Sequence, residues 1–277
     1  MLIGIRVLRY LAIFFILQIS DCSGQIIRPA NAVYFSQFTC YSKVFADAFS
    51  IRGNPASASL LQQSTVGVVT NNRWMIDNLH QYALSAVVPT SIGNIGMQMD
   101  FLHYGDFTEM KLALAYAKSL GKILLGIQFH YHVMHITGYK SNSTLVPELG
   151  MIWKVKENVY TGISIYRPIL LKKNPQQNSF GYNYSSGIGY EISQQVLLAA
   201  SISVLEDQPS QLNLVIQYQF TQQFFASLGI NCRSNEWDGE AGWKWKSLKI
   251  KTMISYHTSL GFSPGLLVEF AFNKPAK

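Results

Sequence analysis

Apolar and polar residues alternate strictly along residues 210–231, SQLNLVIQYQFTQQFFASLGIN. Every second residue from Leu212 to Phe220 is aliphatic or aromatic, and three of the four residues between them are Asn or Gln. After a short polar turn the alternation resumes and runs through Ile230. A period of two predicts β-strands whose two faces meet different surroundings. One apolar face and one polar but uncharged face are typical of strands with lipid outside and a packed polar lumen inside.

The same alternation continues from Ser64 to the end of the chain and predicts about fourteen strands, an even number, as in single-chain outer-membrane barrels. Short links alternate with longer ones, which predicts periplasmic turns and external loops. We therefore expect an all-β fold: a transmembrane antiparallel β-barrel over 62–277 in a bacterial outer membrane, with both termini periplasmic and lipid around it. The predicted strands are 64–73, 79–88, 92–103, 108–118, 123–137, 144–154, 159–170, 181–192, 195–205, 210–221, 224–234, 239–246, 248–259 and 264–273.

Composition agrees with large non-aqueous surfaces, because only 13% of the 277 residues are charged, against about 25% in an average globular chain. Aromatic residues spaced along the strands are expected to form girdles at the two membrane interfaces. The candidates for these girdles are Trp74, Tyr82, Tyr116, Trp153, Tyr190, Trp243, Trp245 and Tyr256.

The N-terminus resembles an export signal. Arg6 and Arg9 precede a short apolar run, and small polar residues follow it. A basic region, an apolar core too short to span a bilayer and a small-residue cleavage site predict a signal peptide over 1–24, cut after Gly24. Cys22 leaves a second interpretation open, in which the chain is cut before this cysteine and acylated on it.

Residues 25–61 lack the alternation and are rich in aromatic residues. The sequence Asn54-Pro55-Ala56 marks a break just before the first strand. Two interpretations stand: a periplasmic leader lying against the barrel mouth, or a hatch that plugs the lumen. The hatch is the favoured hypothesis, with Asn54, Pro55 and Ala56 as its characteristic residues.

The residues expected to face the lumen are polar or charged side chains on the inward faces of the strands. A barrel of this size needs its lumen filled, and buried charges must pair or meet water. The favoured interpretation is a salt-linked interior that fixes a plug, and the alternative is a route for a solute. These residues are Gln98, Asp100, Glu109, Lys111, Gln128, His130, His132, Glu148, Glu191, Gln217, Gln219, Lys244, Lys246, Lys249, Lys251, His257 and Glu269.

Other chemistry has little support in the sequence. His130 and His132 share one strand face, but no third ligand stands nearby, so neither a metal site nor a cofactor is expected. Lys244, Lys246 and the lysines after the next turn are expected to form a solvated periplasmic rim. The nucleophile elbow, phosphate-loop and zinc-protease motifs are absent, and basic residues are not arranged with stacking aromatics. We expect neither an enzyme nor a nucleic-acid-binding protein.

Short motifs resemble a known group of barrels. Residues 46–49, ADAF, precede Asn54-Pro55-Ala56, and residues 112–122, 187–191 and 264–267 read LALAYAKSLGK, GIGYE and PGLL. The chain resembles FadL-like barrels and, more closely, PorV/PorQ-type barrels of Bacteroidota. Residues 35–37, FSQ, are also similar to the start of PorP/SprF-like barrels.

The resemblance implies a fourteen-stranded outer-membrane barrel with an N-terminal hatch. For PorV/PorQ-type members it implies an accessory role in type IX secretion, with other outer-membrane or periplasmic proteins as partners. For FadL-like members it implies transport of small hydrophobic solutes, and for PorP/SprF-like members a role in secretion and gliding. The accessory, non-enzymatic role is the favoured hypothesis, because the inward residues are polar.

Overall fold

The computed structural model describes five stretches of the chain. The predicted signal peptide over 1–24, its Cys22 and residues 25–35 lie outside them. The described residues are 36–139, 141–167, 181–206, 208–232 and 236–272.

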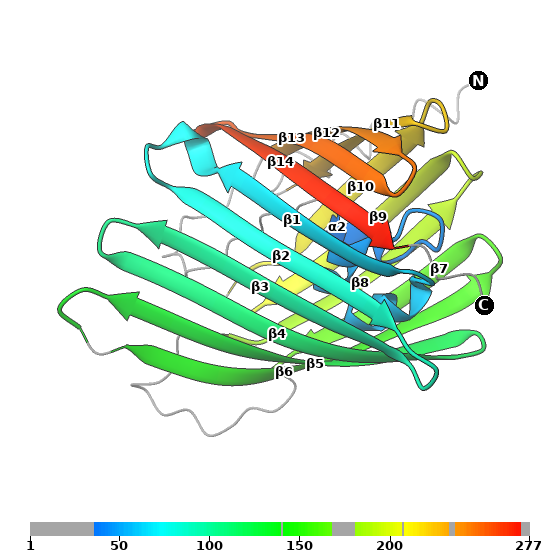
Figure 1. Ribbon diagram of the computed structural model, residues 1–277, viewed down its shortest axis with the longest axis horizontal. Coiled ribbons are helices and arrows are strands. Elements are labelled where there is room, and N and C mark those ends of the chain that lie inside the picture. Colours follow the sequence, from blue (N-terminus) through cyan, green and yellow to red (C-terminus); the bar gives the residue numbers. More distant parts are fainter. Residues whose placement is uncertain (1–35, 140, 168–180, 207, 233–235, 273–277) are drawn as a thin grey trace, which may run out of the picture.

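Fourteen antiparallel strands close into a barrel, which confirms the predicted fold class (Figure 1). Each strand pairs with its sequence neighbours, and β1 pairs with β14 from Ser64↔Phe272 to Asn71↔Gly265. Closure leaves no unpaired sheet edge facing lipid. The strands are β1 Ser64–Asn72, β2 His80–Pro89, β3 Asn94–Tyr104, β4 Phe107–Leu120, β5 Ile123–Ile136, β6 Asn142–Lys156, β7 Val159–Tyr166, β8 Asn183–Glu191, β9 Val196–Leu205, β10 Gln211–Gln219, β11 Phe224–Asn231, β12 Glu236–Trp245, β13 Leu248–His257 and β14 Gly261–Phe272.

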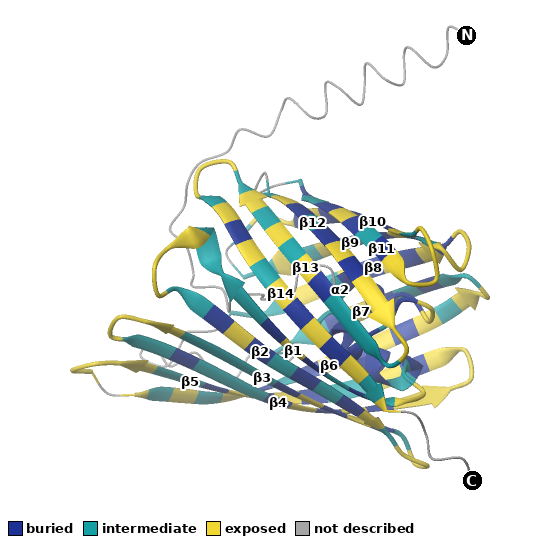
Figure 2. Ribbon diagram, turned by 45° about the horizontal axis from the view of Figure 1, so that its top comes forward, coloured by how far each residue is buried: buried dark blue, intermediate teal, exposed yellow. Residues whose placement is uncertain are grey.

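The two faces of the strands differ as the alternation predicts. In β10 the apolar residues Leu212, Leu214 and Ile216 are exposed on the outside, and Asn213 and Gln217 are buried inside. Exposed and buried residues alternate in the same way along the neighbouring strands (Figure 2). The barrel therefore carries an apolar outer surface and a polar inner one, as a membrane β-barrel requires.

We call the barrel end at which β1 starts and β14 finishes the turn end, and the opposite end the loop end. The links at the turn end are short, but the β3–β4 link at the loop end is equally tight, with only Gly105 and Asp106 between Tyr104 and Phe107. The expected alternation of short and long links is therefore not uniform. The predicted link over 171–180 lies outside the described residues.

Two strands begin three residues before their predicted starts. β12 begins at Glu236, and β14 begins at Gly261 and runs through Pro264. Proline interrupts a ladder because it has no N–H. Pro264 pairs with Ile254 of β13, whereas the ladder with β1 stops at Gly265, so Pro264 has a strand neighbour on one side only.

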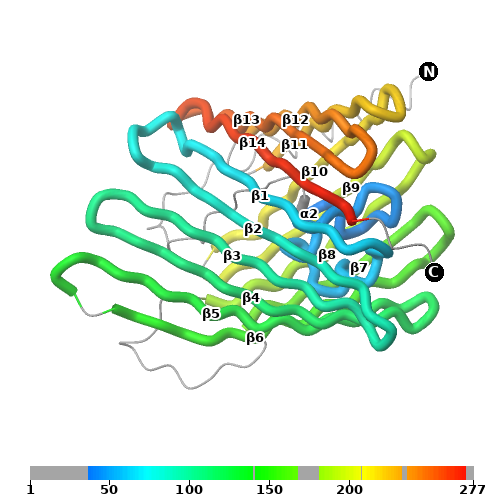
Figure 3. The backbone as a smooth tube through the Cα atoms, in the orientation of Figure 1, coloured from blue at the N-terminus to red at the C-terminus, as the bar shows by residue number. Residues whose placement is uncertain are grey.

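Residues 36–61, which we call the inner segment, lie inside the barrel near the turn end (Figures 1 and 3). They form the short helix α2 (Ser36–Thr39) and the 3-10 helices η1 (Ala48–Arg52) and η2 (Pro55–Leu60). η1 is capped by Asp47, and η2 is capped by Asn54 with Pro55 at its first turn. Their apolar side chains pack in four clusters against inward residues of the wall, for example Phe49 against Val69, Ala83 and Leu267.

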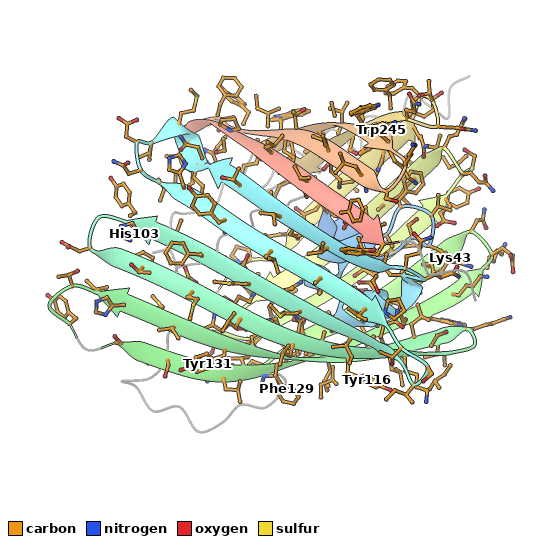
Figure 4. All side chains as sticks on the ribbon, viewed as in Figure 1. Lys43, His103, Tyr116, Phe129, Tyr131 and Trp245 are labelled. Carbon is orange, nitrogen blue, oxygen red and sulfur yellow. The ribbon has the colours of Figure 1, made fainter. Side chains whose placement is uncertain are left out.

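Aromatic side chains project from the outer face, and Figure 4 marks Tyr116, Phe129, Tyr131 and Trp245 among them. Trp74 differs from the other girdle candidates. It lies in η3 (Arg73–Met75), in the β1–β2 link, with positive φ and with the Arg73 guanidinium 4.3 Å from its ring centre. Within the described residues, no helix is long and apolar enough to span a membrane.

The cost of placing an arginine on the outer face should depend on its depth in the membrane. Leu214→Arg, in the middle of β10, should lower the free energy of unfolding by about 2–4 kcal/mol, because it places a cation at the centre of the bilayer. Phe220→Arg, just past the end of the same strand, should cost about 0–1 kcal/mol. Denaturant unfolding in lipid vesicles measures both variants, and equal costs would contradict the assigned lipid-facing surface.

Candidate functional site in the barrel lumen

The inner segment carries three charged residues, Lys43, Asp47 and Arg52. Lys43 is exposed, whereas Asp47 is fully buried and the Arg52 side chain is only 7% exposed. A buried charge is tolerated only if it pairs. The positions of Asp47 and Arg52 are therefore fixed by partners on the wall.

Asp47 binds the wall through lysines of β13. Lys251 Nζ donates to Asp47 Oδ2 at 2.9 Å, and Lys249 Nζ lies 3.6 Å from the same oxygen. Lys251 is 1% exposed and also lies 3.5 Å from Glu240 of β12. We call Asp47, Lys249, Lys251 and Glu240 the anchor cluster. Burial by itself would raise the pKa of Asp47, but the two ammonium groups outweigh it and hold this pKa below its ordinary value.

The anchor cluster corrects the expected solvated lysine rim. Lys251 is buried in an ion pair and Lys249 is mostly covered, so neither belongs to such a rim. Lys244 is exposed near the turn end of β12. Lys246, expected on the inward face, sits in the β12–β13 turn, where its ammonium lies 5.6 Å from the ring centre of the outward-facing Trp245.

Arg52 binds another part of the wall, four strands from β13 in the order of the sheet. Its two terminal nitrogens donate to the two carboxylate oxygens of Asp100 on β3, at 3.0 and 2.6 Å. This bidentate geometry is the strongest form of the carboxylate–guanidinium contact. Asp47 and Arg52 therefore hold η1 between β13 and β3.

Two wall carboxylates bind backbone N–H groups of the inner segment. Glu191 Oε1 accepts from Ser42 Oγ at 2.6 Å and from the N–H groups of Lys43 and Val44 at 2.7 and 3.0 Å. Glu269 Oε2 accepts from the Ala48 N–H at 2.9 Å. These bonds satisfy donors that no helix or strand could satisfy here, so the inward glutamates position the chain between α2 and η1.

Asn54-Pro55-Ala56 lies against β5, β6 and β7. The Asn54 side chain caps η2 by accepting from the Ala56 N–H, and its Nδ2 donates to the carbonyl oxygens of Met151 and Ile163, at 3.2 and 2.9 Å. These two residues face each other across the β6–β7 ladder. One side chain thus starts a helix and bonds to two strands at once.

Glycines on the inner wall make room for this motif. A Cβ added at Gly126 would lie 2.4 Å from Ala56 N, and one at Gly150 would lie 2.2 Å from Asn54 Oδ1. Side-chain carbons do not approach protein atoms this closely. The wall sequence is therefore adapted to the inner segment at these two positions.

A second polar group lies on the inner face of β5–β7. His130 Nε2 bonds Glu148 Oε2 at 2.7 Å, and the Ser164 hydroxyl donates to the other oxygen of this carboxylate. Tyr166 OH bonds His132 Nε2 at 2.7 Å. We call these five residues the histidine cluster. The described residues contain no group of three or more His, Cys, Asp or Glu side chains placed to hold a metal ion.

The structure distributes the predicted lumen residues among different partners. Asp100, Glu191 and Glu269 hold the inner segment, and His130 and His132 bond to the wall.

The other predicted lumen residues have local partners or, in the part of the chain that the structure describes, none. Gln128 Nε2 donates to Gln98 Oε1 at 3.1 Å, Gln217 is buried, and Gln219 donates to the Gln222 carbonyl in the β10–β11 turn. His257 accepts from the N–H groups of Ser259 and Leu260. Within the described residues, the side chains of Glu109 and Lys111 form no hydrogen bond or ion pair.

Several functional contacts are not evident from the sequence. Asp47, Arg52, Asn94 and Ser164 all make buried polar contacts that alternation does not predict, and Asn94 Nδ2 donates to the Ala58 and Leu61 carbonyls at 2.7 and 2.8 Å. One signal was present. Asp47 and Arg52 are isolated charges in an otherwise apolar and small-residue stretch, which requires partners elsewhere if the stretch is buried.

Comparison with known proteins supports the fold. No protein-family model matches the chain, and no curated protein matches it either. Among solved structures, the monoaromatic hydrocarbon channel CymD is similar with a TM-score of 0.60 and 9% identity over 82% of this chain and 93% of that one. The P. putida toluene transporter TodX is similar with a TM-score of 0.56 and 9% identity over 84% and 95%.

These neighbours share the fold of the chain. The chain has the fold of outer-membrane channels, and the neighbours support the FadL-like part of the resemblance at the level of fold.

The glycine contact predicts that Gly126→Ala will displace the inner segment, at a cost of about 1–3 kcal/mol, because its new methyl group meets backbone atoms. Trypsin cleavage after Arg52, which is buried, reports this displacement and should become faster. Gly239→Ala is the matched control, since its methyl group would be in ordinary contact 3.4 Å from Ile254. Equal cleavage of both variants would contradict the close fit.

Asp47→Asn should weaken docking of the inner segment by about 3–5 kcal/mol, because it removes the carboxylate nearest to the buried Lys251 ammonium and leaves Glu240 at 3.5 Å. Hydrogen exchange of residues 38–60 measures the loss, and Asp77→Asn in an exposed loop should change nothing. Because the folded pKa of Asp47 lies below its unfolded value, its contribution is complete above the unfolded pKa, about 3.9, and is lost as the pH falls through the folded pKa. Protection that is unchanged in Asp47→Asn would contradict the role of the anchor cluster.

Proposed function

We propose that this protein is a non-enzymatic outer-membrane transport barrel of the FadL-like kind, which carries small amphipathic molecules and uses its inner segment as a gate. The observation that carries the proposal is the position of that segment. It occupies the lumen near the turn end and is held there only by hydrogen bonds, ion pairs and packing. A solute that crosses the lumen must displace it.

The chemistry of the lumen favours amphipathic solutes over purely apolar ones. Asp100, Glu109, Lys111 and the histidine cluster line the inner wall on the loop-end side of the inner segment. Contact of a hydrocarbon with these residues would remove water from charged groups, which is costly without new partners. A solute with a polar group replaces part of that water. CymD and TodX, which are named for hydrocarbons, share the fold at only 9% identity.

A second candidate is the accessory barrel of a type IX secretion or surface-assembly complex, as the PorV/PorQ-type and PorP/SprF-like resemblances imply. The close fit of Asn54 and Ala56 against wall glycines favours it, because a lumen that stays closed leaves the outer surface as the functional one. On this hypothesis the partners are other outer-membrane or periplasmic proteins.

Two measurements on reconstituted protein test the transport proposal. Proteoliposomes containing the full chain should take up labelled phenyl glucoside, a neutral amphipathic probe, faster than empty vesicles. A chain lacking residues 25–59 should show higher single-channel conductance in planar bilayers, because the lumen is then open.

The two outcomes separate the candidates. If conductance rises on deletion but the full chain takes up no solute, the lumen is permanently closed and the accessory role is favoured. If conductance is unchanged by the deletion, the inner segment does not occlude the lumen and the gate is wrong. Denaturant unfolding of the deleted chain in vesicles shows that the barrel itself has folded.

A further inference from the structure

β4 presents two opposite charges to the lumen. Glu109 and Lys111 are two residues apart on the inward face, and within the described residues neither side chain forms a hydrogen bond or ion pair. Glu109 is 7% exposed and Lys111 is half-buried. Charges this deep in a protein are normally paired.

The partner expected for Lys111 is already engaged. Asp100 stands directly opposite it across the β3–β4 ladder, but Arg52 of the inner segment binds both oxygens of this carboxylate. On the other side, Lys111 faces His132, whose Nε2 is bonded to Tyr166. With the inner segment docked, no carboxylate of the described residues forms an ion pair with the Lys111 ammonium.

Glu109 is isolated by its neighbours in the sheet. It faces Leu102 on β3 and Met134 on β5, neither of which can donate a hydrogen bond to it. The charged groups that act on it are Lys111, Asp100 and, from the β1–β2 link, Arg73. All three act at longer range than an ion pair.

The arrangement selects one kind of ligand. Around Lys111 the charges of Arg52 and Lys111 are outnumbered by those of Asp100, Glu109 and Glu148, so a simple anion gains little there. Two inward residues on one strand are about 6–7 Å apart. A group carrying both an ammonium and a carboxylate or phosphate can span that distance and satisfy both side chains.

We infer that Glu109 and Lys111 form a binding site for a zwitterionic group, in which Glu109 accepts from an ammonium and Lys111 donates to an anionic oxygen. The site lies between the loop end and the inner segment, so a solute meets it before the gate. This inference rests on the proposed transport function and names its substrate class: small amphipathic molecules with a zwitterionic head. A free amino acid and the head of an ethanolamine phospholipid share this chemistry.

Calorimetric titration of the full chain in a nonionic detergent tests the site. The probes are leucine, its N-acetyl derivative, which keeps only the negative charge, and its amide, which keeps only the positive charge. Leucine should bind at least about tenfold more tightly than either relative, since each relative loses one charge-assisted hydrogen bond. Diheptanoyl phosphatidylethanolamine tests the phospholipid source.

Two variants test which charged group of the ligand each of the two residues binds. Glu109→Gln should weaken leucine about tenfold and leave N-acetyl-leucine unchanged, and Lys111→Gln should weaken leucine and leave leucine amide unchanged. Lys118→Gln, an exposed lysine of the same strand near the turn end, is the control for charge alone. Loss of leucine or phospholipid binding in both variants supports the site.

Any of three results would overturn the inference. The three leucine probes could bind with equal affinity, no zwitterionic probe could bind, or binding could be unchanged by both substitutions. The outcome is separable from that of the transport proposal. If the protein takes up phenyl glucoside but binds leucine no better than its two singly charged relatives, the transport proposal is supported and the zwitterion site is wrong. If the protein binds leucine but takes up neither leucine nor phenyl glucoside, the site is supported and the transport proposal is wrong.

Discussion

A strand that crosses lipid must satisfy its backbone polar groups within the sheet, and this requirement governs the whole chain. Pairing of β1 with β14 closes the ladder, so all fourteen strands have neighbours on both sides. Closure then fixes which residues face outward. Apolar side chains such as Leu214 meet lipid, and polar ones such as Gln217 meet the interior. A polar interior of this size needs a partner, and the inner segment supplies it.

The inner segment is held by polar contacts that come from opposite walls. Asp47 pairs with lysines of β13, Arg52 with Asp100 of β3, and Asn54 with carbonyls of β6 and β7. Buried ion pairs add little net stability compared with apolar packing, but they fix position closely. The same contacts make the docking reversible in principle, because each can be exchanged for water. Arg52 also takes both oxygens of Asp100, the carboxylate that faces Lys111 across the β3–β4 ladder.

The sequence predicts the fold far better than the contacts inside it. Strict alternation over residues 210–231 identifies both faces of β10 and β11, and the same pattern gives fourteen strands with ends within a few residues of those observed. It also places Asp100, Glu191 and Glu269 on inward faces. The alternation does not predict the side-chain partners inside the barrel, because it shows which residues face inward but not which of them contact each other across the lumen. Lys251 was expected at a solvated rim, yet it is buried and pairs with Asp47, which lies 204 residues away in the sequence.

Hydrogen exchange of the full chain in lipid vesicles tests the central claim, that residues 38–60 are docked inside the closed barrel by these contacts. The account predicts that the amides of Ala48 and Ala56 exchange as slowly as those of the wall strands, and that the Arg52→Gln variant speeds exchange there without affecting β10. Exchange of these amides at the rate of an unstructured chain in the wild type would contradict it.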